Sequence, residues 1–230
     1  MPPAEPSEDE IERSALRRTL RHVRLPVFTG RARPAALAAG VLIAGFGISS
    51  MLWAELGIGP YDLLIDGVAT QLGVTFGVAS VLLSGIVTVL GWRLGGEVGP
   101  ATVLLVFALG PIIDLWGWLY PEVPELLAAR LLALIGGLAL AAYGLSMVIA
   151  ARFGAGPVEV LMLALTGRGW SVGRVRTVME LTMFLTGWLL GGAIGLGTVV
   201  IAVSIGHLFS AFLPAEVRGD RAARESAPCR

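Results

Sequence analysis

Charged residues are scarce in this chain, and lysine is absent altogether. Only 15% of the 230 residues are charged, and all 17 basic residues are arginine. Soluble domains carry roughly 25% charged residues, so this chain lacks the polar groups needed to cover a globular surface in water. Its formal net charge is zero, and its arginines lie mainly near the two ends. This distribution argues against a basic nucleic-acid-binding protein.

Reactive and metal-binding side chains are also missing. Cys229 is the single cysteine, which excludes an internal disulfide. His207 lies in an apolar run, and no cysteine or second histidine beside it offers a metal site. No Walker motif, nucleophile elbow, HExxH motif or dinucleotide fingerprint occurs. We therefore expect no enzyme activity, no cofactor and no bound metal.

Long apolar stretches dominate what remains. Hydrophobic residues make up 55% of the chain, and the mean hydropathy is +0.79. A helix that crosses the hydrocarbon core needs about 20 mostly apolar residues. Backbone in lipid has no water to bond, so such segments must be helical. The sequence predicts an all-α, polytopic transmembrane bundle with six spans: Ala35–Ala54, Thr75–Trp92, Gly99–Trp118, Leu127–Ala151, Arg176–Leu190 and Gly195–Leu213.

Arginine marks alternate segments between these spans. The leader 1–34, the segment after span two, the segment 152–174 and the tail 214–230 all contain arginine. The segments 55–74, 120–125 and 191–194 contain none. Because cytoplasmic loops carry the excess of arginine, both termini are expected in the cytoplasm.

An internal repeat covers the membrane region. The segment 57–64, GIGPYDLL, returns as 154–161, GAGPVEVL. Further matches follow in the same order, among them Gly40 with Gly137 and Thr102 with Thr198. Each copy contributes three crossings, so the second copy, 120–213, would enter the membrane from the side opposite to the first, 35–119. The sequence thus predicts two inverted three-helix repeats, as in many secondary transporters.

The repeated GxGP element is expected to interrupt the helices. Glycine permits unusual backbone angles, and proline removes a donor while starting a new helix well. The runs that follow, 61–73 and 158–167, are too short to span and would be re-entrant or interfacial. The candidate substrate- or ion-binding residues are Gly57, Gly59, Pro60, Gly154, Gly156 and Pro157, with the acidic residues Asp62, Glu159 and Asp114.

Each acidic candidate has two interpretations. Asp62 and Glu159 occupy matching positions and could bind a cation or a proton, because ionisable groups in a membrane mark functional sites. They could equally stabilise the first turn of a helix. Asp114, after Gly110–Pro111, is either buried or a solvated interfacial acid. Glu180 is expected to pair locally with Arg176.

The motifs resemble those of the YczE/YitT-like bacterial integral membrane proteins. The resemblance rests on 56–62 (LGIGPYD), 73–77 (GVTFG) and 109–114 (LGPIID), and it covers roughly residues 35–213. The second copy departs from the family pattern by carrying Glu159 where aspartate is more usual. The resemblance implies a multi-pass protein of the bacterial inner membrane and no particular activity.

Two functions remain open from the sequence. Inverted repeats with paired helix breaks favour a small secondary transporter or permease, whose partners are the lipid bilayer and a small molecule or ion. The alternative is a non-transporting scaffold or accessory subunit of another membrane complex. A homo-oligomer is compatible with either function.

Overall fold

The computed structural model describes residues 28–120, 122–123 and 125–198, together with Val200, Ile201, Ser204, Leu208 and Phe212. All regular elements within these residues are helical. Most of the leader, most of the sixth predicted span with His207, and the tail 214–230 lie outside the described residues.

Within the described residues, four helical segments are long and apolar enough to cross a membrane, and they agree with the first four predicted spans. The helix in the fifth predicted position is long enough, but it carries Arg174, Arg176 and Glu180. In chain order, the helices are α2 (Ala32–Ala54), α3 (Pro60–Leu72), α4 (Phe76–Arg93), α5 (Pro100–Leu104), η1 (Leu105–Leu109), α6 (Gly110–Leu119), α7 (Leu127–Ala150), α8 (Pro157–Thr166) and α9 (Val172–Leu189).

The third span is one continuous helix with a π-helical turn in its middle. The turn η1 lies directly before Gly110 and Pro111. Proline cannot donate a hydrogen bond, and its ring crowds the preceding turn of an α-helix. A widened π turn accommodates this proline, and such turns recur at functional sites.

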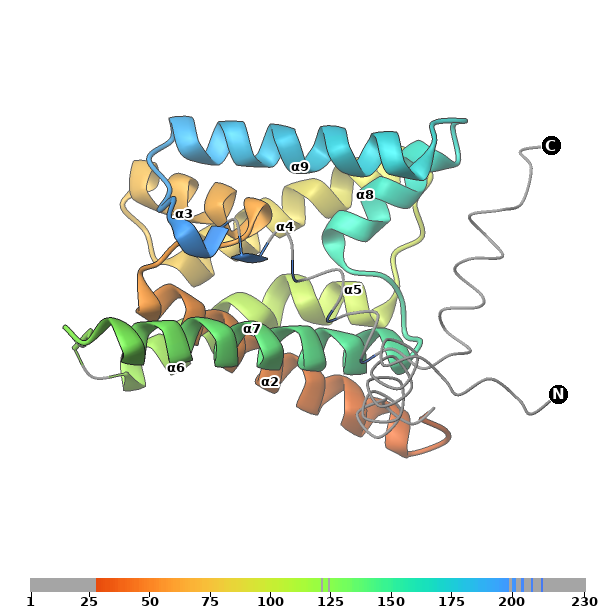
Figure 1. Cartoon of the computed structure of the whole chain (residues 1–230). Coiled ribbons are helices and arrows are strands. Elements are labelled where there is room, and N and C mark those ends of the chain that lie inside the picture. The colour runs from red at the N-terminus through yellow and green to blue at the C-terminus, as the bar shows by residue number, and fades with distance from the viewer. Residues whose placement is uncertain are drawn as a thin grey trace, which may run out of the picture.

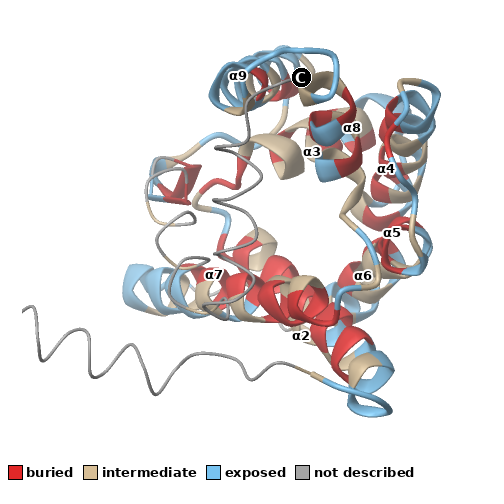
Figure 2. Cartoon of the chain, turned by 90° about the vertical axis from the view of Figure 1, so that its right-hand side faces the viewer, coloured by how far each residue is buried: buried red, intermediate tan, exposed pale blue. Residues whose placement is uncertain are grey.

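The helices form two layers (Figure 1). One layer contains α3, α4, α8 and α9, in which α3 packs against α9 and α8 packs against α4. The other contains α2, α7 and the third span. Contacts of α4 with η1 and α6 join the layers. Figure 2 shows buried residues where α2 and α7 face each other and exposed residues on the outside of the molecule.

Close glycine contacts hold α2 and α7 together. A Cβ atom added to Gly40 would lie 2.7 Å from the Gly144 carbonyl oxygen, and one added to Gly144 would lie 2.5 Å from that of Gly40. Gly47 and Gly137 form a second pair, at 2.5 and 2.7 Å. The order of these pairs makes the two helices antiparallel. Small residues of this kind let helix backbones approach closely in lipid.

Two arginines close the ends of the α2–α7 pair. Arg130, at the start of α7, donates from Nε to the Ala54 carbonyl oxygen at 2.7 Å and from Nη2 to that of Glu55 at 2.9 Å. Arg33, at the start of α2, donates in the same way to Ala151 at 2.9 Å and to Arg152 at 2.8 Å. Each guanidinium thus satisfies the unpaired carbonyls at the C-terminal end of the neighbouring helix.

Candidate functional site

The two GxGP segments adopt the same backbone conformation. In each, a residue with positive φ ends the preceding helix, a glycine with positive φ follows two residues later, and an extended glycine precedes the proline of the next helix. The matching φ values are 50° and 55° at Glu55 and Arg152, 105° and 131° at Gly57 and Gly154, and −66° and −68° at Gly59 and Gly156. Both predicted helix breaks are therefore present.

The first turn of another helix holds each break in place. In the second break, Thr102 Oγ1 donates to the Ala155 carbonyl oxygen at 2.6 Å, and Ala101 N donates to Phe153 O at 3.1 Å. Thr102 is fully buried. The first break receives the matching backbone bond from Gly197 N to Leu56 O at 2.7 Å.

Thr198 is the counterpart of Thr102 at the first break. A Cβ atom on Gly57 would lie 2.6 Å from Thr198 Oγ1. This close approach explains why the first position of the GxGP element is glycine at this break.

Asp62 and Glu159 lie in the first turns of α3 and α8. The Glu159 carboxylate folds back toward its own helix start, where a Cβ atom on Gly156 would collide with Oε2. Asp62 Oδ2 would lie 3.6 Å from a Cβ atom on Gly59. Neither carboxylate has a hydrogen bond or an ion pair to any described residue. Among the described residues, the two helix N-termini are what offsets their charges.

Tyr61 precedes Asp62 in the first turn of α3. Its hydroxyl is 2.8 Å from Ser84 Oγ on α4, which fixes the orientation of the ring. Burial raises the pKa of the Tyr61 phenol above its ordinary value, and the charges of Asp62 and Glu159 act in the same direction. The phenol therefore lies within electrostatic range of both acids, although they come from different helix breaks.

The environment of Asp62 disfavours its charged form. The helix α3 is too short to span a membrane and is not among the four candidate spans. Burial raises the pKa of the Asp62 carboxyl above the usual range of aspartate. Binding of a proton or a cation would offset the cost of this burial.

Asp114 lies apart from these two acids. Its Oδ1 accepts from Gly77 N at 2.8 Å, and its Oδ2 accepts from Thr75 Oγ1 at 2.5 Å. Asp114 therefore caps the start of α4 from the neighbouring span. No contact links it to Asp62 or Glu159 within the described part of the chain.

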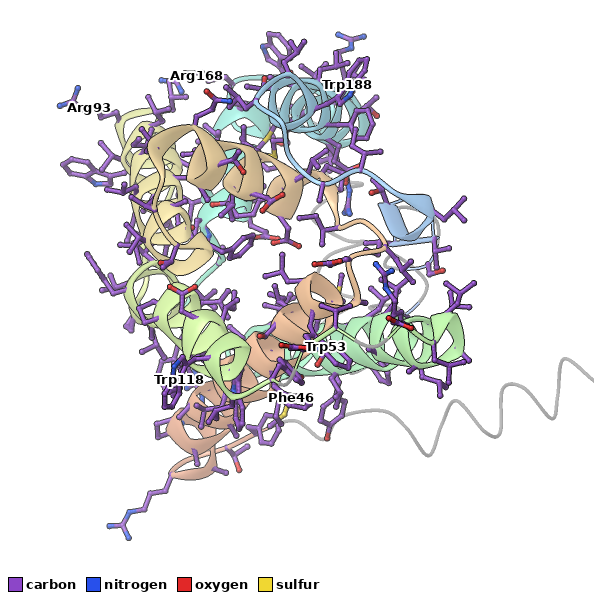
Figure 3. All side chains as sticks on the ribbon, turned by 90° about the vertical axis from the view of Figure 1, so that its left-hand side faces the viewer. Phe46, Trp53, Arg93, Trp118, Arg168 and Trp188 are labelled. Atoms are coloured by element: carbon purple, nitrogen blue, oxygen red, sulfur yellow. The ribbon has the colours of Figure 1, made fainter. Side chains whose placement is uncertain are left out.

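The end of the molecule near the α8–α9 turn carries further arginines. Figure 3 shows Arg93 and Arg168 projecting outward on the same side. Arg168 Nη1 donates to the Leu94 carbonyl oxygen at 2.7 Å. At the end of α3, Gln71 Nε2 donates to the carbonyl oxygen of Leu190, which follows α9, at 2.9 Å. The predicted pair of Arg176 with Glu180 is confirmed at 2.9 Å on the exposed side of α9.

Sequence reasoning missed Tyr61, Ser84 and the two capping arginines. The first copy has Tyr61 where the second has Val158, so the repeat gave no signal for it. Arg33, two residues before the predicted first copy, matches Arg130 at the same offset as the two GxGP elements. Aligning the copies from their first residues would have identified this pair, because a charge repeated at the start of an apolar helix needs a partner.

Comparisons with known proteins agree with the helical membrane architecture. The chain is 30% identical over 185 residues to the uncharacterized membrane protein YczE of Bacillus subtilis (strain 168), covering 78% of this chain and 85% of that protein. It is 31% identical over 172 residues to an uncharacterized protein of Haemophilus influenzae, covering 74% and 78%. It is 29% identical over 182 residues to the uncharacterized protein YyaS of Bacillus subtilis, covering 76% and 89%.

No solved structure matches the chain. A model of a family of unknown function, DUF6198, matches residues 32–214. Together with the relatives and the apolar helices, this match identifies a membrane protein with several transmembrane helices. The chain belongs to the DUF6198 family and is YczE-like.

Proposed function

We propose that this protein is a small secondary transporter whose ion or substrate site lies where α3 and α8 begin. The observation that carries the proposal is the pair Asp62 and Glu159, which lie in the first turns of two broken helices and have no hydrogen-bond or ion-pair partner among the described residues. Interrupted helices with exposed helix ends form the binding sites of many secondary transporters.

Reciprocal contacts support two inverted repeats. The contact of Arg33 with the end of α7 has its counterpart in the contact of Arg130 with the end of α2. The bond from Gln71 to Leu190 likewise has its counterpart in the bond from Arg168 to Leu94. In each case, a contact from the first half of the chain to the second is mirrored by an equivalent contact from the second half to the first. A pseudo-two-fold axis between the copies produces this pattern.

The same arrangement supports six spans, with α9 and the segment 195–213 as the fifth and sixth. Both termini then lie in the cytoplasm of a bacterial inner membrane. The arginines at the α8–α9 turn would face the cytoplasm, as the positive-inside rule requires.

The charge of the site favours a cation or a proton. When both carboxylates are ionised, each carries one negative charge, and each helix N-terminus offsets about half a charge. About one negative charge is left without a counterion in a setting of low dielectric constant. A bound cation or proton would remove this cost, whereas an anion would increase it.

Ion binding can be tested directly on the purified protein. We expect Na+, K+, Li+ or a fall in pH to raise the Tm of the wild-type protein in detergent, measured at constant ionic strength with choline chloride. Asp62→Asn and Glu159→Gln should fold and lose that increase, because each removes one charge from the site. Glu180→Gln serves as the matched control, since Glu180 pairs only with Arg176 on the exposed side of α9.

Flux measurements then separate binding from transport. Proteoliposomes with the responding ion on one side should show wild-type flux that Asp62→Asn abolishes. If Asp62→Asn and Glu159→Gln change neither the ion response nor the flux, the transporter proposal is wrong. A scaffold or accessory role would then explain the fold better.

A further inference from the structure

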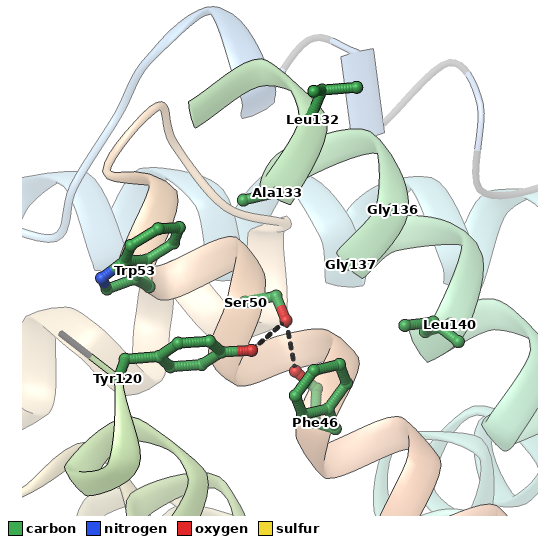
Figure 4. Close-up of a pocket in the computed structure, with 9 residues that line it drawn as sticks. All are labelled: Phe46, Ser50, Trp53, Tyr120, Leu132, Ala133, Gly136, Gly137 and Leu140. Atoms are coloured by element: carbon green, nitrogen blue, oxygen red, sulfur yellow. Dashed lines mark hydrogen bonds between the residues drawn. The ribbon is translucent and has the colours of Figure 1, made fainter. Parts of the chain in front are cut away.

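An apolar groove runs along the outside of the α2–α7 pair (Figure 4). Its volume is about 280 Å3, and it opens away from the protein interior. Both helices are long and apolar enough to span the membrane, so this face is exposed to lipid. The groove is lined by Phe46, Ser50, Trp53, Tyr120, Leu132, Ala133, Gly136, Gly137 and Leu140.

The two walls of the groove differ in chemistry. One wall is aromatic: the rings of Trp53 and Tyr120 stack with centroids 5.2 Å apart, and Phe46 lies 6.0 Å from Tyr120. The opposite wall, on α7, is aliphatic. Gly136 leaves space in this wall because it has no side chain, and nothing lies within 4 Å of a Cβ atom built on it.

The hydroxyl groups in the groove are already bonded. Ser50 Oγ donates to the Phe46 carbonyl oxygen at 2.8 Å, and it lies 2.5 Å from the Tyr120 hydroxyl oxygen. The groove therefore offers mainly apolar contacts to an occupant. An extended hydrocarbon chain satisfies such a surface without leaving a polar group unpaired.

A pair of opposite charges flanks the lining residues along the chain at one end of the groove. Trp53 is followed by Ala54 and Glu55, and the α7 wall begins just after Arg130. Arg130 Nη2 lies 3.6 Å from Glu55 Oε2. The Glu55 side chain is 63% exposed and that of Arg130 is 25% exposed. Tryptophan and tyrosine prefer the headgroup level of a membrane, so this end lies where phospholipid headgroups lie.

We propose that the groove binds one phospholipid, with an acyl chain between the two walls and a zwitterionic headgroup at Arg130 and Glu55. The guanidinium attracts the phosphate, and the carboxylate attracts the ammonium group of an ethanolamine headgroup. The lipid would cover the outer face of α2 and α7 at the end where Arg130 caps α2. This site is separate from the proposed ion site and does not depend on transport.

The proposal can be tested by lipid titration followed by native mass spectrometry. Delipidated full-length protein in mild detergent would be titrated with a phosphatidylethanolamine, and lipid-bound masses counted. Gly136→Leu fills the groove and should weaken binding of the first lipid by about tenfold or more. Gly85→Leu is the matched control, because Gly85 lies on a spanning helix with equally open surroundings. It should leave binding unchanged.

A substitution at Glu55 tests the proposed headgroup contact separately from the acyl-chain groove. Glu55→Gln should weaken binding of phosphatidylethanolamine and strengthen that of phosphatidylglycerol, because the lost carboxylate attracts an ammonium group and repels an anionic headgroup. Equal lipid binding by the wild type and Gly136→Leu at unchanged Tm would overturn the proposal. So would a protein dimer that Gly136→Leu dissociates, because the groove would then hold a second copy.

Discussion

At the scale of single residues, the structure separates candidates that the sequence treats alike. Asp62 and Asp114 both follow a Gly-Pro pair in an apolar region. Asp114 accepts two hydrogen bonds at the start of α4, whereas Asp62 has no such partner among the described residues. The difference arises because Asp114 reaches the start of α4, a helix other than its own, whereas Asp62 lies in the first turn of its own helix, α3. Asp114 therefore stabilises the packing of the third span on α4, and Asp62 stays a candidate for the proposed ion site.

Thr102 provides the sharpest residue-scale prediction for stability. Thr102→Val keeps the shape of the side chain but removes the hydroxyl that bonds Ala155 O and accepts from Gly99 N. Leaving such buried groups unpaired costs about 1–3 kcal/mol. We expect a clearly lower Tm in detergent for Thr102→Val.

The control for this prediction is Thr182→Val. Thr182 is exposed on α9, and its hydroxyl bonds only the Val178 carbonyl oxygen of its own helix. This change should leave the Tm nearly unaltered. Equal Tm values for both variants and the wild type would show that Thr102 does not hold the second helix break.

At the scale of elements, glycine determines how closely α2 and α7 approach. The same residue type has different roles along one helix. Gly137 packs against Gly47, while its neighbour Gly136 faces open space. A hydropathy pattern cannot distinguish them, because both lie in the same apolar run. Only the position of the partner helix does so.

Two alanine substitutions test this distinction. Gly47→Ala would place a methyl group 2.5 Å from the Gly137 carbonyl oxygen, so the helices must separate. Such overpacking costs about 1–3 kcal/mol. Gly136→Ala meets no atom and should be neutral or stabilise the helix by up to about 1 kcal/mol. Thermal unfolding of the two purified variants measures both effects. A Tm for Gly47→Ala at or above that of Gly136→Ala would contradict the packing argument.

At the scale of the whole molecule, the most extensive helix contacts join the first half of the sequence to the second. The helix α3 packs on α9, α4 packs on α8, and α2 packs on α7. Each copy therefore completes the other, and neither half is expected to fold alone. The proposed ion site would likewise draw on both halves of the sequence, since α3 and α8 belong to different halves.

Sided labelling tests the inverted arrangement. In a Cys229→Ser background, single cysteines would replace Val74 and Trp170, which precede α4 and α9 and are both exposed. If the copies are inverted, a membrane-impermeant maleimide should label residue 74 only from the periplasm and residue 170 only from the cytoplasm. Labelling of both positions from one side would rule out inverted repeats.

The sequence by itself determined the class of protein, the first four spans and the two helix breaks. Apolar length, glycine and proline are local properties of the chain, and they act before any tertiary contact forms. The tertiary structure decided which polar groups have partners. The bonds of Thr102, Asp114, Arg33 and Arg130 all join residues far apart in the chain. Such pairings depend on how the helices pack, and helix packing in lipid depends on surface shape rather than on hydropathy.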